Sequence, residues 1–358
     1  MTTACLGRRP PGASTLVYVI LAAVGFGGCG SLTVGSPPSS SQGPRPVVIP
    51  LQIRWLVAGA RPMIYVRVGA GPRVPVLLDT GSTGLHIYTR GARLGPRSGV
   101  AITGRKDSVT YADGTVQRGL LARARVTIGS LTTARAIPFG LITAVGCVAE
   151  IPDCPGAAGI SGRLSIGEFG ILGVALSRSS DDAVNPLLAL PAPYGRDWSI
   201  ELEESGGALT LLPLLSGRPV ARFSLASDGH DPLGAPAWKD KRTRVCWATV
   251  DLRGAACEPT VFDSGSTSML WYGGLLSHSD TSIDDVLVNP GEYIAAWRPG
   301  APTPFWTFTS GTDSSHNSVI SLRGGHPIVI AAVQAFLSFD IDYDDTRGQI
   351  SLYRQSVP

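Results

Sequence analysis

Two nearly identical pentapeptides carry the side chains best suited to acid-base chemistry. Residues 79–83 read Asp-Thr-Gly-Ser-Thr and residues 263–267 read Asp-Ser-Gly-Ser-Thr, each directly after a mainly apolar run. A carboxylate at the end of an apolar strand is costly unless its charge is shared or hydrogen-bonded, so the repeat predicts that Asp79 and Asp263 face one another. Two carboxylates in one site do not both ionise readily, so one holds a proton while the other is a base. Such a pair can activate a water molecule and protonate a leaving group.

A single Asp-Thr-Gly triplet would be weak evidence, because these residues are common in turns. Two copies are more specific, and apolar residues follow both: Leu85, Ile87 and Tyr88 after the first, and Met269, Leu270, Trp271 and Tyr272 after the second. The chain resembles the pepsin-like aspartic proteases, a two-lobed family in which each lobe contributes one such loop. The resemblance covers about residues 50–355. It implies an all-β, bilobal fold with pseudo-twofold symmetry and an active-site cleft between the lobes.

The resemblance also implies roles for the residues of both loops. Asp79 and Asp263 are the expected catalytic pair that holds the attacking water. The hydroxyls of Thr80 and Ser264 are expected to cross-link the two loops. The alternative reading is that the two aspartates only cap backbone amides in turns.

The remaining loop residues are expected to support the catalytic pair. Ser82 and Ser266 are expected to hydrogen-bond the outer oxygens of the two carboxylates, which fixes their geometry and tunes their pKa values. Gly81 and Gly265 are expected to leave room for a substrate backbone.

Residues 109–116 predict a β-hairpin, because an apolar-polar strand runs into an Asp113-Gly114 turn and out again. In the family this position belongs to the flap, a hairpin that closes over bound peptide with a tyrosine near its tip, here Tyr111. Closure of such a hairpin excludes water from the site. The alternative is an ordinary hairpin with a half-buried tyrosine.

Further segments follow or depart from the family pattern. Residues 169–173 resemble the apolar segment that packs beneath the first catalytic loop, and residues 329–332 are its expected counterpart in the second lobe. Within residues 329–332, alanine (Ala331-Ala332) stands where the family usually has glycine. His86 stands where pepsin has a tryptophan that partners the flap tyrosine, so this change bears on the geometry of the flap.

The composition is that of a globular β protein. The chain has 358 residues, 44% of them hydrophobic and 16% charged, which is enough for two lobes that each bury a core. We expect an N-terminal lobe over residues 47–200 and a C-terminal lobe over residues 201–358, with the boundary within residues 191–205. Strands are predicted at residues 63–68, 74–78, 126–128, 208–212, 339–342 and 349–353.

Little helix is expected. One short helix is predicted to begin with Asn185 as its cap and Pro186 at its first position. A second is predicted over residues 330–337. Residues 227–244 are polar and contain Pro and Gly, so we expect an exposed loop there.

The N-terminal segment is typical of an exported protein. Residues 1–29 contain two arginines, an apolar stretch and a small-residue run that ends in Cys29, which predicts a signal peptide and resembles a bacterial lipobox. Cys29 is then either the site of lipid attachment, or a residue that is lost with the signal or retained in an uncleaved anchor. Residues 30–46 are rich in Pro, Ser and Gly and are expected to form a flexible tether rather than a pro-segment.

Four further cysteines form two locally spaced pairs, Cys147 with Cys154 and Cys246 with Cys257. Three connectivities are possible, and the local pairing is favoured because each disulfide then stays within one lobe.

Other classes of site are not favoured. No Cys/His set has zinc spacing, and the aspartates at 340–345 lack the glycine and the closing glutamate of a calcium loop, so we expect no metal and no cofactor. The serine-hydrolase elbow and the zinc-protease helix motif are absent from the sequence. A net charge of +3 without a basic block argues against nucleic acid as a partner.

The sequence therefore predicts an aspartic endopeptidase that hydrolyses peptide or protein substrates. We expect a monomer, because one chain contains both aspartates. It is expected to be exported and to act at the cell surface, held at the membrane by a lipid if Cys29 is modified. The alternative is a catalytically inactive module of the same fold that binds a protein or envelope partner.

Overall fold

A computed structural model of the protein describes residues 43–56, 59–159, 167–249, 256–273, 286–311, 320–323 and 325–355. These residues belong to the unit Pro44–Pro358, apart from Gly43. The predicted signal peptide, Cys29 and most of the predicted tether lie outside the described residues.

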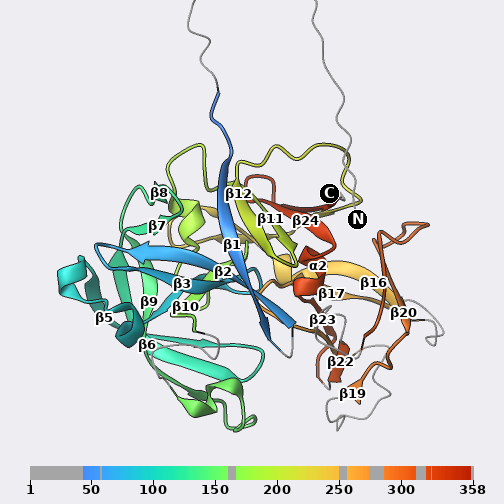
Figure 1. Ribbon diagram of the computed structural model, residues 1–358, viewed down its shortest axis with the longest axis horizontal. Helices are drawn as coiled ribbons and strands as arrows, with labels where there is room; N and C mark the ends of the chain where they lie inside the picture. Colours follow the sequence, from blue (N-terminus) through green and yellow to red (C-terminus); the bar gives the residue numbers. More distant parts are fainter. Residues whose placement is uncertain are drawn as a thin grey trace, which may run out of the picture. The chain divides into compact units, whose positions relative to one another are not determined.

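The described residues form mainly β-strands, in a 15-stranded sheet, an 8-stranded sheet and a two-stranded hairpin (Figure 1). The strands of the largest sheet are β1 (Val47–Leu56), β2 (Gly59–Val68), β3 (Arg73–Asp79), β4 (Thr83–Tyr88), β5 (Ala101–Thr110), β6 (Thr115–Ala124), β7 (Val126–Ile128), β8 (Leu131–Thr132), β9 (Ile137–Cys147), β10 (Gly170–Val174), β11 (Asp197–Glu203), β12 (Gly206–Leu211), β13 (Ala221–Ser224), β24 (Phe339–Asp344) and β25 (Gln349–Arg354).

The 8-stranded sheet is built from the later part of the chain. Its strands are β16 (Thr243–Thr249), β17 (Ala256–Phe262), β18 (Met269–Tyr272), β19 (Val286–Leu287), β20 (Tyr293–Trp297), β21 (Trp306–Thr309), β22 (Ile320–Arg323) and β23 (Ile328–Ala331). The short hairpin pairs β14 (Ser227–His230) with β15 (Pro236–Trp238).

The two sheets repeat one topology. In the first, β2 is antiparallel to β3, β3 is parallel to β10, β10 is antiparallel to β4, and β4 is parallel to β9. In the second, β16, β17, β23, β18 and β22 are paired in the same order and with the same directions. The duplicated pentapeptides thus begin at the ends of two equivalent strands, β3 in the first repeat and β17 in the second.

Strands from both ends of the described chain meet in one part of the largest sheet. The first half of β1 pairs with β12 and its second half pairs with β2, so β1 connects β13-β25-β24-β11-β12 to the first repeat (Figure 1). The expected lobe boundary, residues 191–205, contains β11, which lies between β12 and β24.

Apolar side chains of the strands that carry the pentapeptides are fully buried. Leu78, Leu85 and Ile87 have no exposed surface in the first repeat, and Met269 has none in the second. Phe262, next to Asp263, is 3% exposed and packs against Phe223 with ring centroids 5.8 Å apart. Both loops are therefore anchored to tightly packed apolar strands, which limits how far their carboxylates can move.

Two disulfides, Cys147–Cys154 and Cys246–Cys257, join the locally spaced cysteines, so the favoured pairing is confirmed. The second links facing residues of β16 and β17.

The predicted β class and strands are confirmed, with small shifts at the strand ends. Asn185 caps a 3-10 helix, η3 (Pro186–Ala189), and its Oδ1 accepts a hydrogen bond from the Leu187 N–H at 2.9 Å. The other short helices are α1 (Thr89–Ala92), η1 (Pro96–Ser98), η2 (Pro155–Ala158), η4 (Asp240–Arg242) and α2 (Val333–Phe336).

Two local predictions are wrong. The helix expected over residues 330–337 is only α2, because Ile330 and Ala331 pair with β17 and β18 instead. Residues 227–244 are not one exposed loop, because they form β14, β15 and η4, and the carboxylate of Asp240 is buried. Its Oδ2 accepts a hydrogen bond from the Leu176 N–H at 2.6 Å, which a solvent-facing loop would not provide.

The helices of the described residues are all too short or too polar to span a membrane.

Candidate active site

The two aspartates stand at equivalent ends of the repeated strands. Asp79 is the last residue of β3, pairs with Gly173 of β10 in parallel register and is 6% exposed. Asp263 directly follows β17, is half-buried, and donates its N–H to the Ala331 carbonyl of β23 at 3.4 Å. In both repeats a parallel neighbour strand thus supports the residue that carries the carboxylate.

The structure brings the two loops together through a reciprocal set of hydrogen bonds. The Thr80 N–H donates to Oγ of Ser264 at 3.1 Å, and the Ser264 N–H donates to Oγ1 of Thr80 at 2.9 Å. The Thr80 hydroxyl donates to the Phe262 carbonyl at 2.7 Å, and the Ser264 hydroxyl donates to the Leu78 carbonyl at 2.8 Å. Each hydroxyl is buried, so these four bonds hold the loops in a single mutual position.

Backbone amides orient the carboxylates in the same way in both loops. Oδ1 of Asp79 accepts the Gly81 N–H at 2.8 Å, and Oδ1 of Asp263 accepts the Gly265 N–H at 2.8 Å. The Ser82 hydroxyl donates to Oδ2 of Asp79. These contacts fix the orientation of each carboxyl group within its own loop.

The structure departs from the expectation at Ser266. Its hydroxyl donates to the Ser268 carbonyl at 3.0 Å, while its backbone N–H donates to Oδ1 of Asp263 at 3.2 Å. The side chain therefore does not support the carboxylate as the Ser82 side chain does. The reason is local, since a carbonyl two residues away offers the hydroxyl an acceptor.

The glycines of the two loops allow the carboxyl groups to approach. A methyl group on Gly81 would collide with the carboxyl group of Asp263, and one on Gly265 would lie 2.7 Å from Cγ of Asp79. Each glycine therefore makes room for the aspartate of the opposite loop, which is a tighter requirement than the space for substrate that the sequence suggested.

The two carboxyl groups are electrostatically coupled. Burial raises the pKa of Asp263 well above its usual value, and the charge of Asp79 together with a hydrogen bond between the two side chains raises it further. The pair therefore retains one proton at a pH where an isolated aspartate has lost it.

The residues that follow β10 and β23 contact the two loops in equivalent ways. The Ala175 N–H donates to the Ser82 carbonyl at 2.9 Å, and the Val333 N–H donates to the Ser266 carbonyl at 3.0 Å. Ala331 is fully buried and pairs with Phe262, so the alanine that departs from the family pattern is accommodated in the strand.

The hairpin of β5 and β6 carries Tyr111 in its turn. The Tyr111 N–H donates to the Thr115 carbonyl, the Asp113 carboxylate accepts the Thr115 N–H at 2.8 Å, and Gly114 has a φ of +85°. The Val148 N–H donates to the Gly114 carbonyl at 2.9 Å, which ties the turn to the loop closed by the Cys147–Cys154 disulfide.

The Tyr111 hydroxyl is buried and has no hydrogen-bond partner among the described residues. Burial raises the pKa of this phenol, and the charge of Asp79 is the next largest cause. Its side chain therefore lies within electrostatic reach of the candidate catalytic pair.

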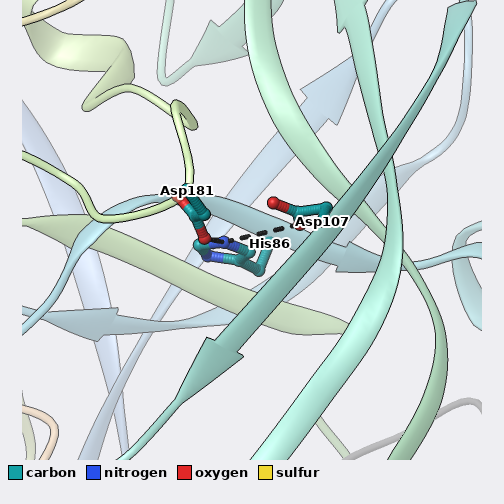
Figure 2. A group of neighbouring side chains, drawn as sticks. All are labelled: His86, Asp107 and Asp181. Carbon is teal, nitrogen blue, oxygen red and sulfur yellow. Dashed lines mark hydrogen bonds and ion pairs between the residues drawn. The ribbon is translucent and has the colours of Figure 1, made fainter.

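A second polar cluster was not predicted from the sequence as a unit. His86 of β4, Asp107 of β5 and Asp181 point toward one another, as Figure 2 shows. Nε2 of His86 lies 2.7 Å from Oδ2 of Asp181 and 3.8 Å from Oδ2 of Asp107. The charges of Asp181 and Asp107 also raise the pKa of Tyr111, so the cluster lies near this tyrosine.

One sequence signal could have pointed to this cluster. Gly140 interrupts the apolar run of β9 and pairs with His86 in parallel register. A methyl group there would collide with both His86 and Asp107. A glycine inside a strand indicates close approach by another group, which here is a pair of polar side chains.

Comparison of the chain with protein-family models and with curated proteins found no match.

Proposed function

We propose that the protein is an aspartic endopeptidase of the pepsin-like, two-lobed type, in which Asp79 and Asp263 hydrolyse a peptide bond. The observation that carries this proposal is the reciprocal Thr80–Ser264 hydrogen bonding, which holds two equivalent aspartate loops face to face. The duplicated strand order supports a pseudo-twofold, two-lobed architecture, with one repeat in each lobe.

The chemistry follows from one proton shared by two carboxyl groups. Asp79, as the carboxylate, takes a proton from a water molecule whose oxygen attacks the carbonyl carbon of the peptide bond. Asp263, whose raised pKa keeps it protonated, gives its proton to the carbonyl oxygen. The tetrahedral intermediate then collapses as its nitrogen takes the proton from Asp79 and a hydroxyl proton returns to Asp263. The products are a carboxylic acid and an amine, and the pair again holds one proton.

The flap has a defined part in this scheme. Tyr111 lies in the β5–β6 turn, and its unpartnered hydroxyl is available to a bound peptide. A hydrogen bond to the substrate would give the buried hydroxyl a partner, and this bond would stabilise the closed flap over the bound peptide.

Export is part of the proposal. Disulfides persist mainly in oxidising compartments, so the two disulfides support an exported protein, for which we propose a place at the cell surface. Both aspartates lie in one chain, which supports a monomer.

The test is cleavage of a diverse peptide mixture from acid to neutral pH, with products identified by mass spectrometry. The wild-type protein is compared with Asp263→Asn and with the exposed-carboxylate control Asp228→Asn. Cleavage by the wild type and the control, but not by Asp263→Asn, is expected. Folded wild-type protein that cleaves nothing at any pH would instead indicate a binding module.

A further inference from the structure

Asp107 is unusual for its place in the fold. Strand β5 is exposed along most of its length, and its one fully buried residue is this aspartate, which is 3% exposed. Neither of its carboxylate oxygens has a hydrogen-bond partner among the described residues. A buried carboxylate without hydrogen bonds is destabilising unless a positive charge compensates it or the group takes up a proton.

His86 is the nearest group that could compensate the charge of Asp107, but it lies closer to Asp181. Asp181 is engaged from three sides: Nε2 of His86 at 2.7 Å, the Ala183 N–H at 3.1 Å, and the Ser179 hydroxyl. The same Nε2 is 3.8 Å from Asp107, which is too far for a hydrogen bond. One imidazole therefore faces two carboxylates.

The geometry suits a metal ion. One ligand atom from each of His86, Asp107 and Asp181 lies within 4.8 Å of the other two (Figure 2). In a tetrahedral zinc site with bonds of about 2.0–2.1 Å, ligand atoms lie about 3.3 Å apart. The observed separations from Nε2, 2.7 and 3.8 Å, bracket that value, and the third separation, between Asp107 and Asp181, is at most 4.8 Å.

The charges also suit a divalent cation. Two carboxylates and a neutral imidazole carry a charge of −2, which one divalent ion neutralises. Imidazole and carboxylate together are ligands that zinc accepts, and a water molecule can occupy the fourth position. Gly140 keeps open the space in which the side chains of His86 and Asp107 meet.

We propose that His86, Asp107 and Asp181 bind one divalent transition-metal ion of the zinc type. The ion would join three separate segments: β4, which follows the first catalytic loop, the flap strand β5, and the segment after β10. It would thus fix the base of the flap relative to the loop that carries Asp79. This structural site lies outside the catalytic pair and is independent of the proposed peptidase activity.

The experiment measures bound metal in the full-length protein. The protein is purified in micromolar zinc, freed of excess metal by gel filtration, and analysed by inductively coupled plasma mass spectrometry. We expect about one zinc per chain in the wild type and a large loss in Asp107→Asn, His86→Gln and Asp181→Asn. The exposed strand β14 offers matched controls, His230→Gln and Asp228→Asn, which should retain the metal.

A second readout separates binding from a folding defect. Extraction of zinc by a chelator should lower the Tm of the wild type by several degrees and leave the Tm of each folded cluster variant unchanged. If one variant does not fold, the other two decide the question. The proposal is overturned if the wild type carries no zinc, or if a folded cluster variant binds as much zinc as the wild type.

The outcome is distinguishable from a failure of the proposed activity. Asp263→Asn should bind zinc like the wild type, because Asp263 is not among the three ligands. Zinc binding without peptidase activity would leave the metal site standing alone. Peptidase activity without zinc binding would reduce the cluster to a hydrogen-bonded His–Asp pair with a second carboxylate beside it.

Discussion

Thr80 and Ser264 each donate a backbone N–H to the hydroxyl of the other, at 3.1 and 2.9 Å. Because each hydroxyl also donates to a carbonyl across the interface between the loops, neither side chain can be lost without leaving buried polar groups unpaired. The two residues are therefore expected to set both the stability of the loop pair and the alignment of the carboxylates.

Thr80→Val tests this relationship, because valine keeps the shape of threonine and removes the hydroxyl. The Ser264 N–H and the Phe262 carbonyl lose a partner, so the free energy of unfolding should fall by about 2–4 kcal/mol. Peptidase kcat/KM should fall as well, because the two catalytic carboxyl groups are no longer held in their relative alignment. Urea unfolding and peptide cleavage measure the two effects.

Thr80→Ser is the matched control, since it retains the hydroxyl. It should stay close to the wild type in both measurements. Equal losses in Thr80→Ser and Thr80→Val would show that packing, and not hydrogen bonding, accounts for the effect.

Tyr111→Phe should separate function from stability. The hydroxyl is buried without a partner among the described residues, so its removal should leave the Tm unchanged or raise it. If the hydroxyl donates to bound substrate, kcat/KM should fall by about tenfold or more. Tyr293→Phe, at a tyrosine that is 49% exposed, is the control and should change neither quantity. A lower Tm with unchanged kcat/KM would remove Tyr111 from the flap role.

The carboxyl pair of Asp342 and Asp197 predicts how stability depends on pH. Burial raises the pKa of Asp342 to about 8, and the charges of Asp197 and Asp344 contribute. An unfolded aspartate titrates near pH 4. Between about pH 4 and pH 8 the folded state thus binds a proton that the unfolded state does not, so the free energy of unfolding falls as pH rises through this window.

Asp342→Asn removes this titration while keeping a side chain that can hydrogen-bond Asp197. The variant should have a Tm close to that of the wild type at pH 5 and a Tm higher by about 3 °C or more at pH 8. Thermal unfolding at the two pH values, with Asp228→Asn as control, measures the difference. A variant less stable than the wild type at pH 8 would refute the sign.

The sequence predicted the two aspartate loops because their signal is local and duplicated. Each loop directly follows a strand that reads as apolar, and two turn-like copies of one pentapeptide at such places are unlikely to arise by chance. Their partners Thr80 and Ser264 could be named only through the family resemblance, since nothing in the local sequence shows that two hydroxyls so far apart meet.

The cluster of His86, Asp107 and Asp181 shows where such reasoning ends. Asp181 stands in a Ser-Ser-Asp-Asp stretch that reads as an exposed turn, and Asp107 stands in a polar strand that is exposed at most positions. Their burial depends on how β5 packs over β4 and β9, which is a tertiary property. Tertiary pairing also explains why the helix predicted over residues 330–337 is shorter than expected. The apolar pattern there suits a helix, but Ile330 and Ala331 pair with neighbouring strands.

The most direct measurement of the central claim is a double-mutant cycle on the two aspartates. kcat/KM for one cleaved peptide is determined for the wild type, Asp79→Asn, Asp263→Asn and the double variant, with folding checked by circular dichroism. If the carboxyls act as one unit, each single variant loses at least about 10³-fold and the double variant loses no more than either. A folded single variant that retains wild-type activity, or losses that multiply in the double variant, would contradict the account.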